Sequence, residues 1–262
     1  MTAEATSAES GPAVLALVEV GKHFGGVSAL QGVSIEVHRG EVVALVGDNG
    51  AGKSTLLRCV AGAHLPDVGS IEVDGRPVVI RHPSEARALG IEAVHQDLAL
   101  ADHLDVVANM FLGREISRRI GPFGVLDNRA MRAKANEIIS EFGIKIPSLR
   151  ARVRHLSGGQ RQGVAIGRAV GWGTKLVMMD EPTAALGVRE TARVQELIKS
   201  LAGKGLAVLL VSHNLDQVFE ICDRVYVLRR GRLAAERKIA NTTKEEVVGL
   251  ITGAFAGEAA TT

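Results

Sequence analysis

The sequence predicts an α/β fold with a mainly parallel sheet, an N-terminal antiparallel β part and a helical insert. Three observations predict it. Apolar strands and helices alternate regularly through the second half of the chain, and strands of that kind form parallel sheets covered on both faces. Short β-rich runs broken by glycine occupy residues 14–46. Apolar residues at helical spacing dominate from about residue 98 to residue 156.

Length and composition fit one globular domain. The chain has 262 residues, of which 46% are hydrophobic and 23% charged, and it shows no internal repeat. We therefore expect one domain over residues 14–254, with disordered tails at 1–13 and 255–262. The first tail does not read as a signal peptide, and no apolar run reaches the roughly 20 residues that cross a bilayer. Any work at a membrane is expected to pass through a partner chain.

Charge and cysteine usage argue against several kinds of partner. The net charge is only +2 and the basic residues are spread along the sequence, so no nucleic-acid partner is expected. We interpret the arginine pairs at 118–119 and 229–230 as solvated surface rather than a phosphate-backbone site. Cys59 and Cys222 lack CxxC spacing, which argues against metal binding and fits a reducing compartment. Both are expected in the core.

The first half of the chain predicts strands around a glycine-rich loop. Strands are expected at 14–20, 33–37 and 41–46, then the loop and a helix at 55–61. A hairpin over 70–80 is expected to turn at Asp74-Gly75, and residues 91–95 predict a further strand.

The second half predicts the insert and the βα alternation. In the insert, helices are expected at 105–111 and 129–142, with loops marked by Gly113, Gly121, Pro122, Gly124 and Pro147. After it the predicted order is helix 159–170, strand 176–179, helix 188–201, strand 207–211, helix 215–221, a last strand 224–228 and a closing helix 244–251.

The strongest local pattern is Gly47-Asp48-Asn49-Gly50-Ala51-Gly52-Lys53-Ser54, which satisfies GxxxxGK[ST] between an apolar strand and a helix. Its glycines let backbone N–H groups curl around phosphate oxygens at a helix N-terminus, where the dipole also favours negative charge. We expect Lys53 to reach the β- and γ-phosphates of ATP, Ser54 to bind Mg²⁺ and Thr55 to contact the α-phosphate. The alternative is a structural glycine turn with an incidental lysine.

Two adjacent carboxylates, Asp180 and Glu181, end the apolar strand at 176–179. This position is the carboxyl end of a buried strand, where ligands of a parallel sheet gather. Asp180 is expected to hold Mg²⁺ through water, and Glu181 to orient or deprotonate the attacking water. An Asp-Glu pair after a strand can also be a helix cap. Met178 and Met179 are interpreted as core filling.

A third pattern is the run Leu156-Ser157-Gly158-Gly159-Gln160-Arg161-Gln162. A serine followed by two glycines at a helix start presents a hydroxyl and backbone N–H groups to an anion, and the alternative is an ordinary serine N-cap. This run resembles the signature of the ABC ATPase family. The resemblance implies that Ser157 to Gln160 complete the ATP site of a second subunit. Two copies would pair head to tail, with Ser157 and Gly159 touching the γ-phosphate.

Other residues match the same family in order along the chain. Gln96 resembles the Q-loop glutamine that contacts Mg²⁺ or the attacking water, and His213 resembles the switch histidine that bonds the γ-phosphate. Phe24 resembles the aromatic residue that stacks on adenine, with a core position as the alternative. One position departs from the pattern: Gly187 stands where the family usually has an aspartate that helps to link the two sites. Because this chain lacks that aspartate, the strength of coupling between the two ATP sites of a dimer is in doubt.

The resemblance covers residues 15–254, and within the family residues 96–115 and 181–188 resemble ATPases of bacterial monosaccharide importers. It implies an ATP-hydrolysing subunit at the cytoplasmic face of the cell membrane. Transmembrane permease subunits would be its partners, and an external sugar-binding protein would act through them. Two such domains are often fused in that subfamily, so this chain would pair with itself or with a second ATPase.

Three alternatives stay open at this point. An exporter ATPase would carry the same catalytic motifs. A soluble ABC ATPase acting on ribosomes or DNA usually has two fused units or a long coiled-coil insert, and neither is visible here. A regulatory binder without turnover is disfavoured by the intact carboxylate pair at 180–181.

Overall fold

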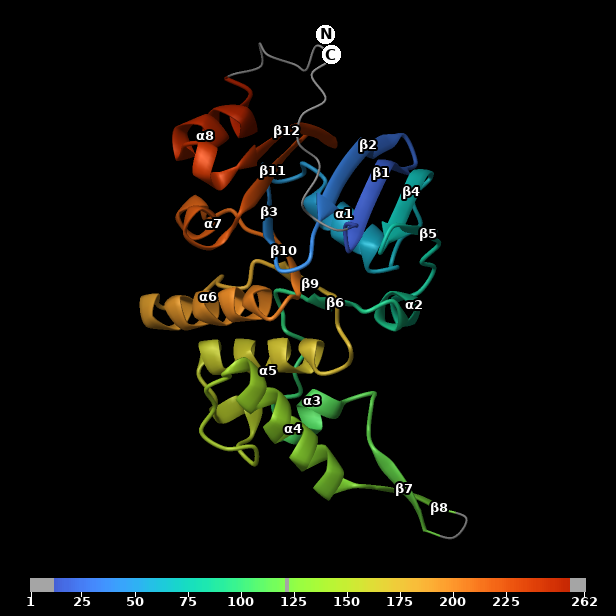
Figure 1. Cartoon of the computed structure of the whole chain (residues 1–262), viewed down its shortest axis with the longest axis vertical. Helices are drawn as coiled ribbons and strands as arrows, with labels where there is room; N and C mark the ends of the chain where they lie inside the picture. Colours follow the sequence, from blue (N-terminus) through green and yellow to red (C-terminus); the bar gives the residue numbers. More distant parts are fainter. Residues whose placement is uncertain (1–11, 121–122, 255–262) are drawn as a thin grey trace.

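A six-stranded sheet forms the centre of the chain in the computed structural model, which describes residues 12–120 and 123–254 (Figure 1). Its order is β12-β11-β3-β10-β9-β6. The strands are β3 (Val42–Val46), β6 (Ile91–Val94), β9 (Leu176–Asp180), β10 (Ala207–Val211), β11 (Arg224–Arg229) and β12 (Arg232–Lys238). All neighbours pair in parallel except β11 and β12. The predicted mainly parallel sheet is confirmed.

A second sheet is antiparallel and has the order β2-β1-β4-β5. Its strands are β1 (Leu15–Phe24), β2 (Val27–Val37), β4 (Val68–Val73) and β5 (Arg76–Val78). The β4–β5 turn lies at Asp74-Gly75, as predicted, and both residues have positive φ, at 48° and 72°, as the common two-residue hairpin turn requires. The predicted tails at 1–13 and 255–262 lie outside the described residues apart from residues 12 and 13.

The central sheet is buried on both faces. Val42, Ala44 and Val46 of β3 face one core, whereas Val43 and Leu45 face the other, because neighbouring residues of a strand point to opposite sides. The first core packs against α5 (Gly158–Val170), α6 (Val188–Gly203), α7 (Leu215–Ile221) and α8 (Lys244–Thr252). The second lies against α1 (Lys53–Val60) and the antiparallel sheet.

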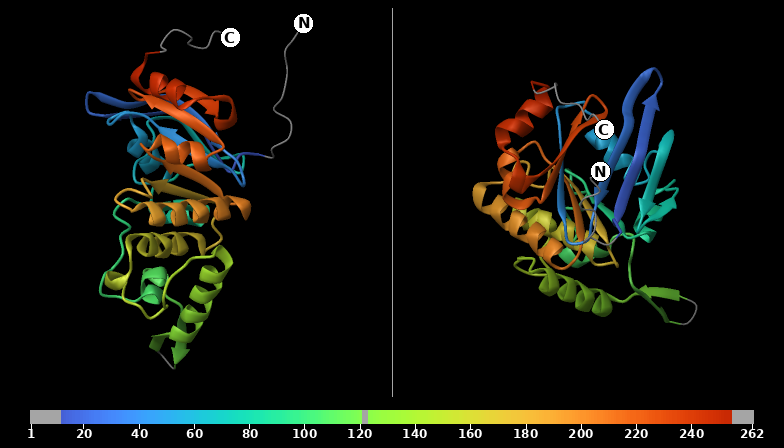
Figure 2. Two further views of the ribbon diagram at one scale, coloured as in Figure 1. Left: turned by 90° about the vertical axis from the view of Figure 1, so that its left-hand side faces the viewer. Right: turned by 45° about the horizontal axis from the view of Figure 1, so that its top comes forward.

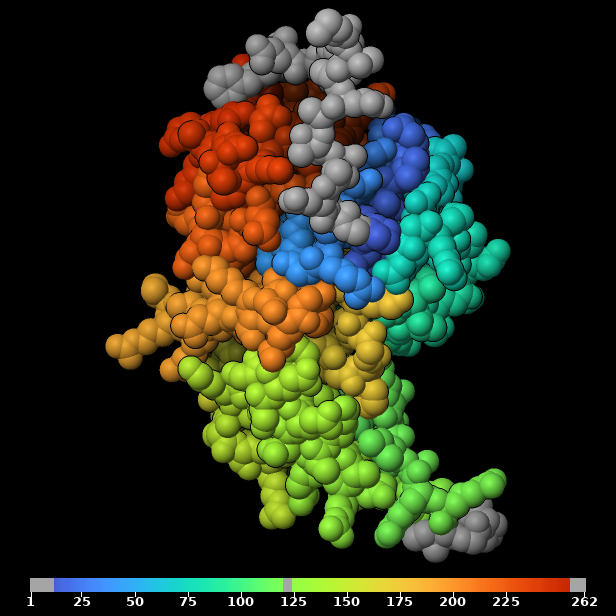
Figure 3. Space-filling model, in the orientation of Figure 1, coloured from blue at the N-terminus to red at the C-terminus, as the bar shows by residue number. Residues whose placement is uncertain are grey.

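The segment predicted as a helical insert is not wholly helical. It contains α3 (Val106–Phe111), α4 (Asn128–Phe142) and a one-turn 3-10 helix at Val153–His155, as well as a hairpin of β7 (Ser117–Ile120) and β8 (Phe123–Leu126). The sequence predicted only loops there, because glycine and proline interrupt the apolar pattern. The hairpin projects from the body of the molecule, and the views in Figures 2 and 3 place α3 and α4 beyond the layer of α5 and α6.

Two further elements differ from the prediction. Strand β12 follows β11, although residues 224–228 were expected to be the last strand. Its side chains alternate between exposed and half-buried and carry many charges, so it lacks the apolar alternation that marks a strand. Helix α2 (Pro83–Ala88) is only six residues long, too short for a periodic pattern. Within the described ranges, no helix combines the length and the apolar character needed to span a membrane.

Candidate active site

A cleft of about 1090 Å³ brings together the carboxyl ends of β3, β6, β9 and β10. This volume slightly exceeds the range of roughly 300–1,000 Å³ that is typical of ligand pockets. Most of the predicted site residues line it: Gly47, Asp48, Asn49, Gly50, Gly52, Lys53, Ser54, Thr55, Gln96, Asp180, Glu181 and His213. Ala51 is buried beneath the loop, at 3% exposure. Residues spread over more than 160 positions of sequence therefore share one cavity, because parallel strands end at the same edge.

The glycine-rich loop depends on glycine at two positions. Gly47 has φ +149°, and a Cβ there would lie 2.1 Å from the carbonyl oxygen of Leu228. Gly52 has φ +106°, and its Cβ would lie 2.7 Å from the carbonyl oxygen of Ala29. Helix α1 starts directly afterwards and has no side-chain cap. Its first backbone N–H groups are thus free to bind an anion, which is the predicted phosphate geometry.

Lys53 is the first residue of α1, and its side chain turns back onto this loop. Its ammonium donates hydrogen bonds to the carbonyl oxygens of Gly47 at 2.6 Å and Asp48 at 2.9 Å. Burial lowers the pKa of Lys53, while the charges of Glu181 and Asp180 oppose that lowering. The cation is therefore positioned where the loop and the carboxylate pair meet.

Glu181 occupies a strained position next to the end of β9. Its φ is +51°, a conformation that costs about 1–2 kcal/mol for a residue with a side chain. Its N–H donates to the carbonyl oxygen of Val211 at 2.9 Å, so strand pairing continues one residue past Asp180 and helps to hold the strain. Strain of this kind concentrates at functional sites.

Glu181 and His213 contact each other. The Nδ1 atom of His213 lies 2.7 Å from Oε1 of Glu181, and the histidine side chain is 76% exposed while that of Glu181 is 16% exposed. The carboxylate is thus sheltered, and the more exposed imidazole contacts it at the cleft wall. A carboxylate held this way can orient a water molecule and accept its proton.

The residues predicted to hold Mg²⁺ offer suitable donors. Ser54, Gln96 and Asp180 all line the cleft, and each presents an oxygen, the ligand type that Mg²⁺ prefers. Among the residues that the structure describes, no group of three or more His, Cys, Asp or Glu could hold a metal ion. A single carboxylate fits a magnesium ion that completes its coordination with substrate phosphates and water.

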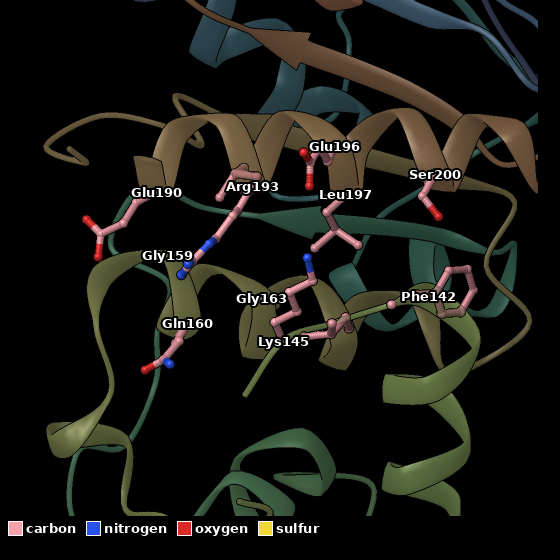
Figure 4. A pocket seen from close by; sticks show the side chains of 13 residues that line it. Phe142, Lys145, Gly159, Gln160, Gly163, Glu190, Arg193, Glu196, Leu197 and Ser200 are labelled. Carbon is pink, nitrogen blue, oxygen red and sulfur yellow. The ribbon is translucent and has the colours of Figure 1, made fainter. Parts of the chain in front are cut away.

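Residues 157–160 lie outside this cleft. Ser157 caps helix α5 in a capping box with Gln160: Gln160 N donates to Ser157 Oγ at 3.4 Å, and Ser157 N donates to Gln160 Oε1 at 2.9 Å. The N-cap alternative is thus correct as local geometry. Gly159 and Gln160 instead line a separate pocket of about 260 Å³ between α5, α6 and residues 142–145 (Figure 4).

The positions of Phe24 and Arg230 depend on tertiary contacts that the sequence did not reveal. Phe24 is 44% exposed, so the core alternative is wrong; its ring packs edge-on against His64 at 5.2 Å between centroids. Arg230 is exposed, as expected for solvated surface, and it also lines the cleft. It reaches the cleft because the β11–β12 turn packs on the loop, with Gly231 N donating to Ala51 O at 2.9 Å. The sequence held no signal for that contact.

A glycine loop at a helix N-terminus, its lysine and a carboxylate pair at the end of a second strand of the same sheet define a P-loop nucleotide hydrolase. Residues 30–184 match the family described as ABC transporter, and the chain belongs to that family. It is an ATP-hydrolysing cassette. Its fold is similar to the ADP conformation of an ATP-binding cassette of an ABC transporter, with a TM-score of 0.77 at 27% identity, covering 94% of this chain and 99% of that one.

Related sequences share most of this chain. A xylose/arabinose import ATP-binding protein of Sulfolobus acidocaldarius is 44% identical over 94% of this chain and 96% of its own length. A fructose import ATP-binding protein of Rhizobium meliloti is 46% identical over 89% and 91%. A ribose import ATP-binding protein of Burkholderia cenocepacia is 40% identical over 92% of this chain but only 47% of its own length.

Proposed function

We propose that this chain hydrolyses ATP to power the uptake of a sugar, a monosaccharide, through a separate membrane permease. The relatives named above are import ATP-binding proteins for xylose or arabinose, fructose and ribose. Their names favour import over the exporter and soluble-factor alternatives. The observation that carries the ATPase part is the convergence of Lys53, Gln96, Asp180, Glu181 and His213 on one cleft.

In this proposal the glycine-rich loop binds the phosphates of ATP. Backbone N–H groups at the start of α1 and the Lys53 ammonium contact the β- and γ-phosphates, and Thr55 lies beside the α-phosphate. Phe24 stacks on adenine, supported by its exposed ring at the end of β1. Mg²⁺, held by Ser54, Gln96 and Asp180, neutralises developing negative charge when it is bound.

Glu181 orients the attacking water in the proposed reaction. The water oxygen bonds to the γ-phosphorus, the bond from that phosphorus to the β–γ bridging oxygen breaks, and the water proton passes to the carboxylate. ADP and phosphate are the products. His213, 2.7 Å from Glu181, donates a hydrogen bond to the γ-phosphate, and Gln96 helps to align the water.

The site is completed by a second subunit in this proposal. Residues 157–160 lie outside the cleft of their own chain and form the start of α5, and a helix N-terminus favours an anion. They would face the γ-phosphate bound by a partner, either a second copy or another ATPase. A dimeric bacterial ABC transporter cassette has a similar fold, with a TM-score of 0.71 at 25% identity over 86% of this chain.

The permease is the proposed route from hydrolysis to transport. ATP binding would close two cassettes, residues 98–156 would rotate as an insert, and the movement would be transmitted to the permease. The work comes from the difference in ATP affinity between the open and closed dimers. We place the chain at the cytoplasmic face of the cell membrane as a peripheral subunit; a sugar-binding protein acts through the permease, and no nucleic acid takes part.

An affinity pull-down tests this function. Tagged Glu181→Gln chain, expected to bind ATP without hydrolysing it, is purified with ATP from solubilised membranes, and the accompanying chains are identified by mass spectrometry. A multi-helix permease together with a sugar-binding protein is the expected result. Ribosomal or DNA-repair proteins without a permease would overturn the importer proposal and leave the ATPase activity standing.

A further inference from the structure

A two-pronged hydrogen bond joins helix α5 to the loop that follows Gln96. Arg168, in the last turn of α5, donates from Nη2 to the carbonyl oxygen of Leu98 at 2.7 Å and from Nη1 to that of Ala99 at 2.8 Å. The planar guanidinium presents its donors in a fixed fork that suits two adjacent acceptors. The helix that begins with Ser157 is thereby tied to the nucleotide cleft of its own chain.

The two acceptor residues have an unusual backbone. Leu98 has φ +56° and Ala99 has φ +45°, a left-handed conformation that residues with side chains rarely adopt. Such strain persists only where the surroundings hold it. Since Arg168 bonds to the carbonyls of these same two residues, it helps to stabilise the strained segment from outside the loop, together with the packing of Leu98 against the core.

Arg168 is itself held among charged groups. Burial lowers the pKa of its guanidinium, and the Glu92 carboxylate opposes that lowering. Glu92, on β6, is 9% exposed and pairs with Arg114. The Arg114 guanidinium lies 5.4 Å from the ring centroid of Trp172. The Arg168 side chain is thus half-buried close to the Glu92–Arg114 ion pair.

The far end of the segment is fixed by α3. The Asn109 side chain accepts a hydrogen bond from Ala101 N at 2.7 Å and donates one to Ala101 O at 3.0 Å, and Asn109 is fully buried. The loop between Gln96 and Ala101 is thus held by α5 at one point and by α3 at another. A shift of α5 against the central sheet would pull directly on the residues next to Gln96.

We propose that Arg168 is a positioning residue that sets the conformation of the loop carrying Gln96 and couples it to helix α5. The inference rests on the proposed function. In the proposed dimer, Ser157 at the start of α5 serves the ATP site of one cleft while Gln96 serves the other. Arg168 then links the two ATP sites through one chain. This link does not need the aspartate that the family usually has at position 187, where this chain has glycine.

Glycine substitution in the loop provides a specific test. In the full chain, Arg168→Ala is expected to lower kcat about tenfold, because a misplaced catalytic group loses rate steeply, while ATP affinity stays within about twofold. Adding Ala99→Gly to the Arg168→Ala variant is expected to raise its kcat about threefold or more, since glycine adopts positive φ without penalty. Ala99→Gly alone should change kcat by less than about twofold. Amide exchange over residues 97–101 should rise in Arg168→Ala and fall back in the double variant.

Matched variants complete the test. Arg132→Ala removes an exposed cation from α4 and is expected to leave kcat unchanged. If Arg168→Ala does not fold, Arg168→Lys keeps the charge but not the fork, and the same rescue is expected. An unchanged kcat, or a loss that Ala99→Gly leaves in place, would overturn the role of Arg168. If the wild-type chain has no ATPase activity that Glu181→Gln removes, the proposed function fails instead.

Discussion

Helices α1 and α5 both begin at glycines, but their surroundings differ. Before α1, Gly47 and Gly52 have positive φ and are packed so closely that a Cβ would collide with backbone oxygens. That helix has no side-chain cap and opens into the cleft with Asp180 and Glu181. Helix α5 is capped by Ser157, and no residue of its first turn lines that cleft.

The difference shows that two helices with glycine-rich starts have unlike surroundings in this chain. The end at α1 lies beside a carboxylate pair and a histidine, so it is suited to chemistry. At the α5 end, hydrogen bonds from the Ser157 hydroxyl and the Gly159 N–H help to lower the pKa of the Glu190 carboxylate, so these donors already face an anion. In the proposed function they recognise a phosphate held by a second chain. The proposed function treats these ends as two halves of one site that a second chain brings together.

Replacing the Glu181 carboxylate, which lies in the cleft beside α1 and has no counterpart in the proposed role of α5, has the largest expected effect on ATP hydrolysis. Glu181→Gln should lower kcat for ATP hydrolysis about 10³-fold, the range typical of a lost general base, while nucleotide binding persists. Phosphate release measures the first and equilibrium titration with ATP the second. Glu141→Gln, on the exposed face of α4, is the control. A Glu181→Gln enzyme with normal turnover would remove this residue from the mechanism.

Mixing two inactive variants tests whether the two halves act across chains. Lys53→Ala should abolish nucleotide binding at its own cleft, and Ser157→Arg should block the phosphate-facing end of α5. Random pairing of equal amounts makes about half of the dimers mixed. In each mixed dimer one of the two sites is intact, because it joins the Lys53 of one variant with the Ser157 of the other. About a quarter of wild-type ATPase activity should therefore return. Each variant alone should stay inactive. No recovery on mixing would argue that Ser157 does not act in a second subunit.

The closeness of packing around the glycine loop predicts a difference between two glycines. Gly47→Ala places a Cβ 2.1 Å from the carbonyl oxygen of Leu228 and should reduce the free energy of unfolding by about 3 kcal/mol. Gly50 has φ +80° with nothing within 4 Å, so Gly50→Ala should cost about 1 kcal/mol. Urea unfolding of the three chains measures both. Equal losses of unfolding free energy in the two variants would show that the close contact with Leu228 does not make Gly47 more sensitive than Gly50.

The smallest effect concerns the thiol on α1. Cys59 is fully buried, and burial raises its pKa to about 11, so at pH 8 only about one thiol in a thousand is ionised. We expect no alkylation of Cys59 by iodoacetamide at pH 8 in the native chain and full alkylation in denaturant. Rapid labelling at pH 8 would mean that α1 opens readily.

The cleft was predictable because its chemistry depends on short runs. The residues at 47–55 and at 180–181 follow apolar strands, and parallel strands bring their carboxyl ends to one edge. Nearly all the predicted cleft residues do line one cavity. The burial of Met178, Met179, Cys59 and Cys222 is also confirmed, since apolar neighbours in a strand or helix predict burial locally.

The β7–β8 hairpin, β12, Arg230 and the strained pair at 98–99 were not predictable in the same way. Strand β12 is formed by backbone hydrogen bonds to β11 and not by an apolar pattern. The contacts of Arg168 with Leu98 and Ala99 join residues about 70 positions apart. No local pattern encodes such a contact.

The sequence by itself determined most of the order of strands and helices, the phosphate loop, the carboxylate pair and the family to which they belong; the β7–β8 hairpin, α2 and β12 escaped it. Each of these depends on the spacing of residue types over a few positions. Only the tertiary structure decided that Glu181 contacts His213, that residues 157–160 lie outside the cleft and that Arg168 holds the loop after Gln96. These contacts arise from packing between distant segments, which fixes distances and backbone strain that composition and spacing leave free.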